Sequence, residues 1–439
     1  MSKRLAFALL AVSAAGLSVN IHSAASAAEK KPADMKTWQI GTPIVNYWAG
    51  PPMTDAVAQQ MADGGWNLVW CTEKELDVAE HHGLRAMLLV EGLLDPASLD
   101  DPEKRAQLDA LIDRVKGHPA MYSYHLRDEP SISAFPALGK LVEYLRQRDP
   151  AHMAYINLFP TYATNQQLGT QGDTVTAYKE HVRQYVEIVK PALISYDHYH
   201  FSASERSDEQ FRGTPYFANG RDGGEYFLNL ALIRQAAQEA DVPFLNIVQA
   251  CSWTPSMRVP NGDEMRFLVY TTLAYGGQGI SYYVYCWPGH IGGIANPDGT
   301  PTVIYHALKT LNREFVAIAS QLQPLRSLGV SHLGMMPMGG EPLSASSAFT
   351  VDPPVAPLSY KPPEKMKGIV LGTFGTPGRP THLLVVNLDY TQKTATTVVG
   401  PGPLEVFDPR TGQWEPSRHG ERAPILLLPG GGKLLRVRP

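Results

Sequence analysis

Between residues 37 and 326 short apolar runs alternate with longer amphipathic segments, and this alternation restricts the possible folds more than any other feature of the chain. Strands that are apolar throughout and separated by helices indicate a parallel sheet with helices on its faces. The segments between the runs have the apolar spacing and the capping residues of helices. Eight strands are predicted: Gln39–Tyr47, Asn67–Cys71, Leu84–Val90, Met121–Leu126, Met153–Leu158, Ala192–Tyr196, Phe244–Ala250 and Gly279–Tyr285.

Eight strand–helix units over ~290 residues have the size of a (β/α)8 TIM barrel. The other common parallel fold, the dinucleotide-binding sheet, requires a G-x-G-x-x-G turn after its first strand. No such turn follows the first predicted strand. The fold class predicted for residues 37–326 is therefore α/β, a TIM barrel.

Beyond residue 326 the pattern changes. Residues 327–365 are rich in Pro, Gly, Ser and Met, which indicates a linker with irregular structure. Residues 366–439 contain short β-type runs separated by turn residues, which predicts a small C-terminal all-β domain resembling a β-sandwich.

The N-terminus has the pattern of an export signal. Two basic residues precede the apolar run Leu5–Val19, and a stretch of small residues that fits an A-x-A cleavage site ends at Ala27. The run is shorter than the ~20 residues that a membrane-spanning helix needs. The sequence thus predicts a signal peptide over residues 1–27, an exported protein (periplasmic or extracellular) and no stable membrane anchor.

Composition excludes some functional classes. With a net charge of −4 and no basic blocks, the chain lacks the charge pattern of a nucleic-acid-binding protein. Three cysteines do not make a disulfide framework. Three buried thiols are expected, and a single bridge between Cys251 and Cys286 is the alternative.

In a TIM barrel the C-terminal ends of the strands form the active face. The residues predicted there are mainly acidic and aromatic. Aromatic rings can stack on the apolar faces of sugars, while carboxylates and amides bind their hydroxyls, so the composition of this face predicts a carbohydrate substrate. In strand order these residues are Tyr47, Trp48, Glu91, Asp128, Glu129, Asn157, Asp197, Tyr199, Gln249, Trp253 and Trp287.

The sharpest signal is the sequence Asp128-Glu129-Pro130 at the end of the fourth strand. A residue before proline is biased away from the right-handed helical region, so Glu129 is expected to be extended and to point into the barrel mouth. A carboxyl group held among aromatic residues favours its protonated form and can donate a proton near neutral pH. The alternative is an acid that favours the N-terminus of the next helix.

A strand that ends in Asp-Glu-Pro at the fourth position resembles the clan-A glycoside hydrolases, including the family 42 β-galactosidase-like proteins. The segment 263–283 is similar to uncharacterised members of that group, and the resemblance covers residues 37–326. It implies a glycosidase in which Glu129 is the acid/base. The chain departs from the pattern at the seventh strand, where the group has a nucleophilic glutamate and this sequence has Gln249.

Because an amide cannot be the nucleophile, a second carboxylate is needed, and Asp197 at the end of the sixth strand is the first choice. Glycosidases hold their two carboxyl groups roughly 5–5.5 Å apart for a covalent intermediate and roughly 6.5–9.5 Å apart when water attacks. The sequence leaves this separation open. Glu264 is a weaker candidate, more consistent with a helix cap.

Other functions compete with this hypothesis. The Asp128–Glu129 pair resembles that of substrate-assisted hexosaminidases, in which the aspartate orients an N-acetyl group of the substrate. Gln249 favours a non-catalytic carbohydrate-binding barrel, and a polysaccharide lyase is a further alternative. A cluster of Asp197 with His125, His198 and His200 could bind a metal, but it lacks a ligand motif. Neither a metal nor a cofactor is predicted.

Overall fold

The computed structural model describes residues 40–202, 224–352 and 368–439. The predicted signal peptide over residues 1–27 lies outside these ranges. Within them, no helix has the length and apolar character needed to cross a membrane.

Eight parallel strands form the barrel, in the order β1-β9-β7-β6-β5-β4-β3-β2. Each one lies on or close to a predicted apolar run, so the prediction of a TIM barrel is confirmed. The short strands β8 (Cys251–Ser252) and β10 (Ile291–Gly292) pair outside it. The barrel strands are β1 (Ile44–Trp48), β2 (Leu68–Cys71), β3 (Arg85–Leu88), β4 (Met121–Asp128), β5 (Met153–Leu158), β6 (Ile194–His198), β7 (Phe244–Gln249) and β9 (Gly279–Tyr283).

The side chain of Asn67 joins the first two strands, β1 and β2. The backbone N–H of Asn67 donates to the carbonyl of Val45 (3.1 Å), and the N–H of Val45 donates to the side-chain oxygen Oδ1 of Asn67 (2.9 Å). Arg85 also donates to that oxygen (3.0 Å), which fixes the amide. A side chain thus supplies hydrogen bonds that the backbone of a ladder would otherwise make.

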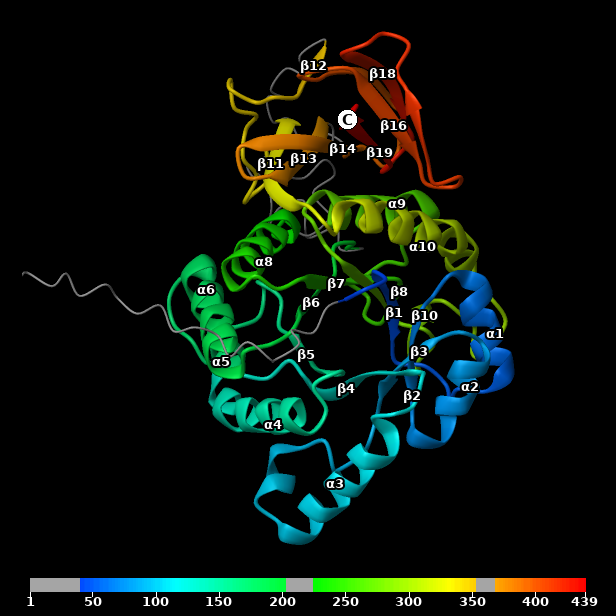
Figure 1. Ribbon diagram of the computed structural model, residues 1–439, viewed down its shortest axis with the longest axis vertical. Helices are drawn as coiled ribbons and strands as arrows, with labels where there is room; N and C mark the ends of the chain where they lie inside the picture. Colours follow the sequence, from blue (N-terminus) through cyan, green and yellow to red (C-terminus); the bar gives the residue numbers. More distant parts are fainter. Residues whose placement is uncertain (1–39, 203–223, 353–367) are drawn as a thin grey trace, which may run out of the picture. The chain divides into compact units, whose positions relative to one another are not determined.

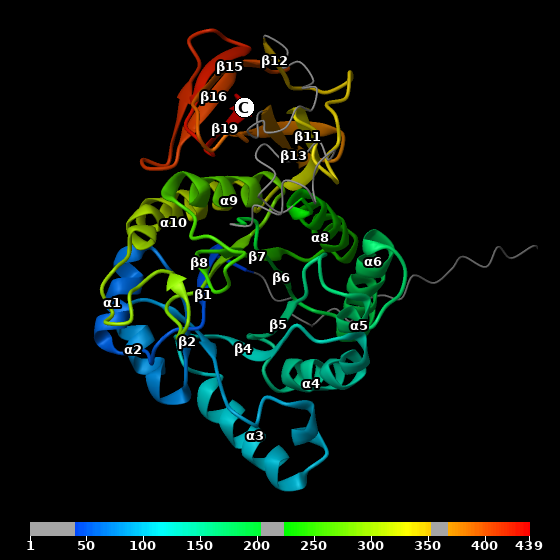
Figure 2. The ribbon, with the colours of Figure 1, turned by 180° about the vertical axis from the view of Figure 1, so that it is seen from behind.

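Helices surround the strands, as Figure 1 and the view from behind in Figure 2 show. Several of them begin at residues with good capping side chains, for example Thr54, which accepts from the backbone N–H of Val57 (3.3 Å). The helices are α1 (Asp55–Gly64), α2 (Leu76–His81), α3 (Pro102–Val115), α4 (Phe135–Arg148), α5 (Asn165–Leu168), α6 (Thr174–Gln184), α8 (Tyr226–Ala240), α9 (Gly262–Ala274) and α10 (Val303–Leu322).

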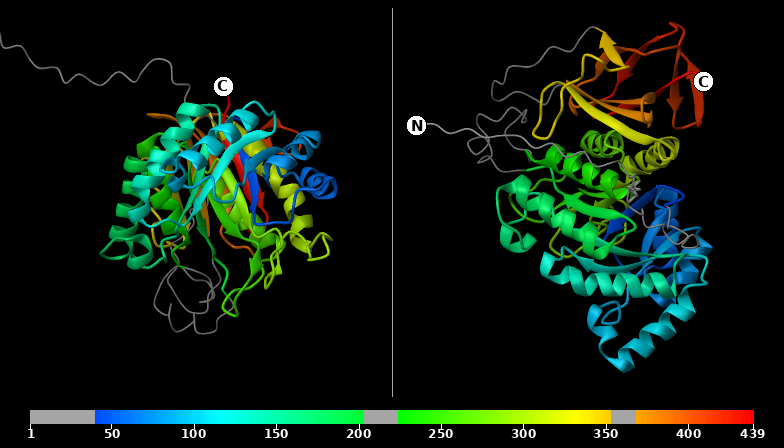
Figure 3. Two further views of the ribbon diagram at one scale, coloured as in Figure 1. Left: turned by 90° about the horizontal axis from the view of Figure 1, so that it is seen from below. Right: turned by 60° about the vertical axis from the view of Figure 1, so that its left-hand side comes forward.

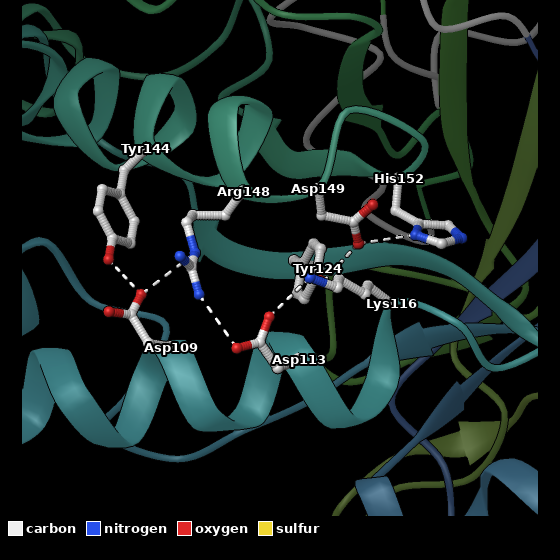
Figure 4. Close-up of polar contacts among 8 residues, drawn as sticks. All are labelled: Asp109, Asp113, Lys116, Tyr124, Tyr144, Arg148, Asp149 and His152. Carbon is white, nitrogen blue, oxygen red and sulfur yellow. Dashed lines mark hydrogen bonds and ion pairs between the residues drawn. The ribbon is translucent and has the colours of Figure 1, made fainter.

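Polar contacts fasten β4 to its neighbours on the outside of the barrel (Figure 4). The Tyr124 hydroxyl of β4 donates to Asp149 (2.7 Å), which also contacts His152 (2.7 Å). Burial alone would raise the pKa of Asp149, but hydrogen bonds from His152 and Tyr124 outweigh it and lower the pKa. Arg148 at the end of α4 lies between the carboxylates of Asp109 (3.4 Å) and Asp113 (3.2 Å) on α3. These contacts hold the strand that ends in Asp128.

The C-terminal domain consists of two antiparallel sheets, visible in yellow to red in Figure 3. The apolar residues between them include Phe349, Leu371 and Leu435, all fully buried. The six-stranded sheet contains β11 (Arg326–Gly334), β13 (Gly368–Thr376), β14 (Arg379–Asn387), β19 (Gly432–Val437), β16 (Leu404–Asp408) and β17 (Gln413–Pro416). The three-stranded sheet contains β12 (Thr350–Asp352), β15 (Thr394–Val399) and β18 (Arg422–Leu427).

Two of these strands differ from the sequence prediction. β12 and all of β11 except its first residue lie within the stretch 327–365 that was expected to be irregular, and they pair with β15 and β13. The Gly, Ser and Pro residues that surround them hide the β pattern. Their pairing partners lie tens of residues further along the chain, where no local pattern can reveal them.

All three cysteines are free thiols. Cys71 and Cys251 are buried, and burial raises the pKa of each thiol to about 12. The alternative of a bridge between Cys251 and Cys286 is not what the structure contains. The raised pKa values also make the two buried thiols poor nucleophiles.

Candidate active site

Three carboxyl groups meet at the C-terminal ends of β4 and β6. Asn157 on β5 lies between two of them, and its Nδ2 donates to Oδ1 of Asp128 (3.1 Å) and to Oδ1 of Asp197 (3.0 Å). The side chains of Glu129 and Asp197 are hydrogen-bonded to each other. Because two ionised carboxylates repel, this contact requires that they share a proton. The structure therefore brings the two predicted catalytic residues into one cluster.

The backbone presents Glu129 in an unusual way. Its φ angle is +42°, in the left-handed region that non-glycine residues rarely adopt, rather than extended as the following proline suggested. Its N–H donates to the carbonyl of Asn157 (2.9 Å), which holds the strained turn against β5. The prediction of extended backbone is wrong, but the side chain reaches Asp197 in the barrel mouth. The alternative of a helix-start acid does not fit this contact.

The environment makes both members of the pair weak acids. Burial and the nearby charge of Asp128 raise the pKa of Glu129 to about 7, against a smaller lowering from its hydrogen bond with Asp197. Asp197 is only 3 % exposed, and its burial together with the charges of Glu129 and Asp128 raises its pKa well above the usual range. A proton is thus available in this cluster near neutral pH.

Asp128 differs from the other two in its access to water. Burial of the carboxyl group raises its pKa, while the hydrogen bonds from Asn157 and from the backbone of Glu129 lower it. The residue as a whole is exposed at the barrel mouth, so solvent screens its charge and limits the rise. Asp128 is therefore the member of the cluster best placed to remain ionised.

The raised pKa of Glu129 predicts a pH-dependent stability. Between the ordinary value near 4.5 and the folded value of about 7, the folded protein keeps a proton that the unfolded chain has lost. Stability therefore falls as the pH rises through this window. Replacing Glu129 by Gln removes the penalty, so Tm is expected to rise by about 1–3 °C at pH 8 and to stay unchanged at pH 4.

Differential scanning calorimetry of the parent and Glu129→Gln at the two pH values measures this effect. Glu91→Gln is the matched control, because it makes the same change at an exposed carboxylate outside the cluster. An equal change of Tm at pH 4 and pH 8 for Glu129→Gln would contradict the proposed proton-holding environment.

An aromatic group lies beside the carboxyl cluster. The ring of Tyr199 contacts those of Trp253 (4.7 Å between centroids) and Tyr283 (5.1 Å). Burial raises the pKa of Tyr283 to about 12, and the charges of Asp128, Asp197 and Glu129 contribute to that rise, which places this phenol near them. Tyr199 and Trp253 were predicted at this face, whereas Tyr283 was not, because it lies within the strand β9.

Tyr283 is oriented by a further residue that the sequence did not indicate, His290. Nδ1 of His290 lies 3.1 Å from the carbonyl of Pro288 and therefore carries the ring proton. The Tyr283 hydroxyl consequently donates to Nε2 (3.0 Å). This leaves the lone pairs of the Tyr283 oxygen free to accept a hydrogen bond from a hydroxyl group of a ligand.

A second aromatic group lies inside the barrel. The ring of Trp48 contacts those of Trp70 (5.0 Å) and His125 (5.5 Å), and all three side chains are partly exposed. Burial lowers the pKa of His125 to about 4, so its imidazole is neutral at neutral pH. Trp48 was predicted to face the mouth, while Trp70 was missed because it precedes the end of its strand.

Two predicted substrate contacts are wrong. Tyr47 is fully buried on the outer side of β1, where its ring packs on Tyr285 (5.1 Å), because successive side chains of a strand point to opposite faces. Gln249 is also fully buried, and its amide binds backbone atoms: it accepts from the N–H of Phe201 (2.8 Å) and donates to the carbonyl of Arg258 (2.7 Å). Gln249 holds loops together and does not replace a nucleophile.

Two other predicted residues lie apart from the cluster. Glu91 is exposed and lines a separate hollow of about 470 Å³ together with Asp95, Lys104 and His125. Trp287 is 51 % exposed, and within the described ranges no ring contact joins it to Tyr199 or Trp253. Their roles as sugar contacts stay predictions.

The histidines of the metal alternative have other partners. His198 is hydrogen-bonded through Nδ1 to Asn229 (3.0 Å), and burial lowers its pKa to about 3. The ring of His200 stacks on Phe267 (5.4 Å) in a buried aromatic core. Glu264 forms the capping box of α9 with Asn261, which confirms the preferred interpretation of that residue.

Among the described residues, one group has the arrangement of donors that a metal needs: Asp77, Glu80 and His118 on the surface. Nδ1 of His118 accepts from the backbone N–H of Ala120 (3.2 Å), so a neutral ring carries its proton on Nε2. That N–H donates to Asp77 (3.0 Å). A metal ligand would need Nε2 without its proton, so the donors present fit a hydrogen bond and not a metal ion.

Comparison with known proteins gives remote similarities. No protein-family profile and no curated sequence matches the chain. Solved structures that resemble it include a β-galactosidase from the psychrophilic Marinomonas ef1 (12% identity, TM-score 0.44), with 64% of this chain and 60% of that chain covered. A second is a glucosidase from Croceicoccus marinus (12% identity, TM-score 0.43), with 92% of this chain and 96% of that chain covered. A third is the endoglucanase Cel5A of Pseudomonas stutzeri (14% identity, TM-score 0.38), with 60% of this chain and 84% of that chain covered.

This chain thus spans less than two thirds of the Marinomonas enzyme. At these identities and TM-scores the similarities assign neither a family nor a substrate to it. Membership of the family 42 group, implied by the sequence motif, stays a prediction.

Proposed function

We propose that this protein is an exported glycoside hydrolase and that Glu129 is its proton donor. One observation carries the proposal: Glu129 and Asp197 share a hydrogen bond at the C-terminal end of a TIM barrel, in surroundings that raise the pKa of Glu129 to about 7. The aromatic rings of Tyr199 and Trp253 beside the carboxyl groups suit the apolar face of a sugar. Export rests on the predicted signal peptide over residues 1–27.

In this mechanism protonated Glu129 transfers its proton to the glycosidic oxygen as the bond to the anomeric carbon breaks. The departing alcohol is neutral, and positive charge develops on the sugar ring. Asp128, which two hydrogen bonds help to keep ionised, stabilises that charge. A nucleophile or an activated water completes the hydrolysis.

Asp197 is the proposed second carboxylate, as nucleophile or as the base for water. Its carboxyl group is hydrogen-bonded directly to Glu129, whereas hydrolysis needs the anomeric carbon or a water molecule between the two carboxyl groups. A bound sugar must therefore part them and leave the shared proton on Glu129, so that Asp197 is ionised before it attacks or accepts a proton from water.

The same contact favours a second candidate, substrate-assisted hydrolysis of a 2-acetamido sugar. In that mechanism the acetamido oxygen attacks the anomeric carbon and no enzyme nucleophile is needed. Asp128, adjacent to Glu129, would orient the acetamido N–H.

Matched aryl glycosides decide between the two. Release of nitrophenol from 2-hydroxy glycosides supports Asp197 as the second carboxylate, and release from 2-acetamido glycosides alone supports the substrate-assisted route. Saturable binding of sugars, with no release of phenol or reducing ends across aryl glycosides and polysaccharides, would contradict both and identify a carbohydrate-binding barrel.

Trp253 is expected to contribute to sugar binding. Its ring is partly exposed and held by Tyr199 and Tyr283 (4.7 and 4.9 Å). Trp253→Ala is expected to raise KM by about 3–10-fold with a smaller change in kcat, since an aromatic contact contributes about 0.5–1.5 kcal/mol. Trp253→Phe keeps an aromatic surface and should retain most of the affinity. A fall in kcat at constant KM would instead place Trp253 in the chemical step.

A further inference from the structure

A chain of three buried side chains leads to the carboxyl cluster from below. Tyr155 on β5 and Ser195 on β6 are joined by their hydroxyls (2.7 Å), and the Ser195 hydroxyl contacts Oδ1 of Asn157 (3.0 Å). All three residues are at most 2 % exposed. Sequence analysis assigned Asn157 to sugar binding, but its side-chain atoms are already occupied by protein groups.

The direction of each hydrogen bond in this chain follows from the chemistry of the groups. The amide oxygen of Asn157 has no hydrogen, so Ser195 must donate to it. Ser195 has one hydroxyl proton, so its oxygen accepts from Tyr155. The two N–H bonds of the Asn157 amide then match the two carboxylate oxygens of Asp128 and Asp197. A flipped amide would direct its oxygen at both carboxylates and leave Ser195 without an acceptor.

We propose that Tyr155 and Ser195 are positioning residues that fix the Asn157 amide, so that it donates to Asp128 and Asp197 and not to Glu129. Hydrogen bonds to an ionised carboxylate favour that form, and Asn157 gives them to two of the three acids. The Asn157 side chain gives none to Glu129 in the described structure. The inference deepens the proposed function and rests on it.

Other titratable groups also face this cluster. They belong to several elements around the mouth. Those that interact with Glu129 or Asp197 are Asp128 on β4, Tyr155 on β5, Tyr162 after β5, Tyr178 on α6, Tyr196 on β6, Tyr199 after β6 and Tyr283 on β9.

The test measures the titration of Glu129 itself and needs no substrate. Full-length protein labelled with ¹³C at the glutamate carboxyl carbon is titrated by NMR, and the Glu129 signal is identified by its loss in Glu129→Gln. The variants are Ser195→Ala and Tyr155→Phe. Their matched controls are Ser123→Ala, at a buried hydroxyl with no hydrogen-bond partner among the described residues, and Tyr122→Phe, whose hydroxyl binds the carbonyl of Ile40 at the base of the barrel.

Ser195→Ala removes the donor to the Asn157 oxygen, and Tyr155→Phe removes the group that orients the Ser195 hydroxyl. With the amide less firmly held, Asp128 binds protons more readily, and the negative charge that raises the pKa of Glu129 decreases. The pKa of Glu129 is therefore expected to fall by about 1 unit or more in both variants and to stay unchanged in both controls. If Ser195→Ala does not fold, the comparison of Tyr155→Phe with Tyr122→Phe decides.

Two results would overturn the inference, and they differ in what they say about the proposed function. If the pKa of Glu129 is near 7 in the parent and neither variant changes it, Tyr155 and Ser195 have no positioning role, while Glu129 remains the proposed proton donor. If the pKa of Glu129 in the parent is near the ordinary 4.5, both the positioning role of Tyr155 and Ser195 and the role of Glu129 as proton donor are contradicted.

Discussion

Glu129→Gln is expected to lower kcat on natural glycosides by about 10²–10⁴-fold, the range that general acid catalysis contributes. Glutamine keeps the size and the hydrogen-bonding capacity of the side chain but cannot donate a proton to a departing oxygen. The raised pKa of about 7 also predicts that activity of the parent falls as the pH rises through 7, because Glu129 must be protonated to act. Initial rates of the parent and the variant across pH 4–9 measure both effects.

KM of Glu129→Gln should change much less than kcat, since the proton is transferred only in the transition state. The matched control is Glu103→Gln, which makes the same change at an exposed acid of α3. Loss of activity in Glu103→Gln comparable to that in Glu129→Gln would show that the assignment of the proton donor is incorrect.

Asp197→Asn is the second substitution with a large expected effect, a decrease of kcat/KM by about 10²-fold or more. Asp197 is 3 % exposed and touches both Asn157 (3.0 Å) and Glu129. An amide at this position can neither attack nor share a proton. It can donate to Glu129, which favours the ionised form of Glu129 and lowers its pKa.

The high-pH limb of the rate profile is therefore expected to move below pH 7 in Asp197→Asn, in addition to the loss of rate. Asp113→Asn on the surface of α3 is the control for the chemical change and should retain both the rate and the profile. An Asp197→Asn protein with parental rate and an unshifted profile would exclude Asp197 from the mechanism under either candidate function.

The sequence predicted the barrel well because each strand is a continuous apolar run between turn residues, which is a local property. It also predicted that Glu129 and Asp197 would lie at strand ends on the same face. What it could not predict was the direction of single side chains. A strand alternates faces at every residue, so of the two neighbours predicted at the mouth, Trp48 is partly exposed and Tyr47 is buried on the other side of β1.

The contacts within the site depend on features that no local pattern records. The register of β4 against β5 shifts between His125 and Arg127, and Glu129 then turns through the left-handed region. Together these irregularities bring Glu129 to Asp197, 68 residues away by sequence number. Tyr283 and His290 were missed for a related reason, since their importance comes from a contact across a loop and not from their position at a strand end.

The dependence on the leaving group tests the role of Glu129 most directly. Rates of the parent and Glu129→Gln are compared on glycosides of one sugar with an alkyl alcohol and with dinitrophenol as leaving groups. Dinitrophenolate departs without protonation, so the account predicts a rate ratio of about 10²–10⁴ for the alkyl glycoside and a ratio close to one for the dinitrophenyl glycoside. Equal ratios for the two substrates would show that Glu129 does not protonate the departing oxygen.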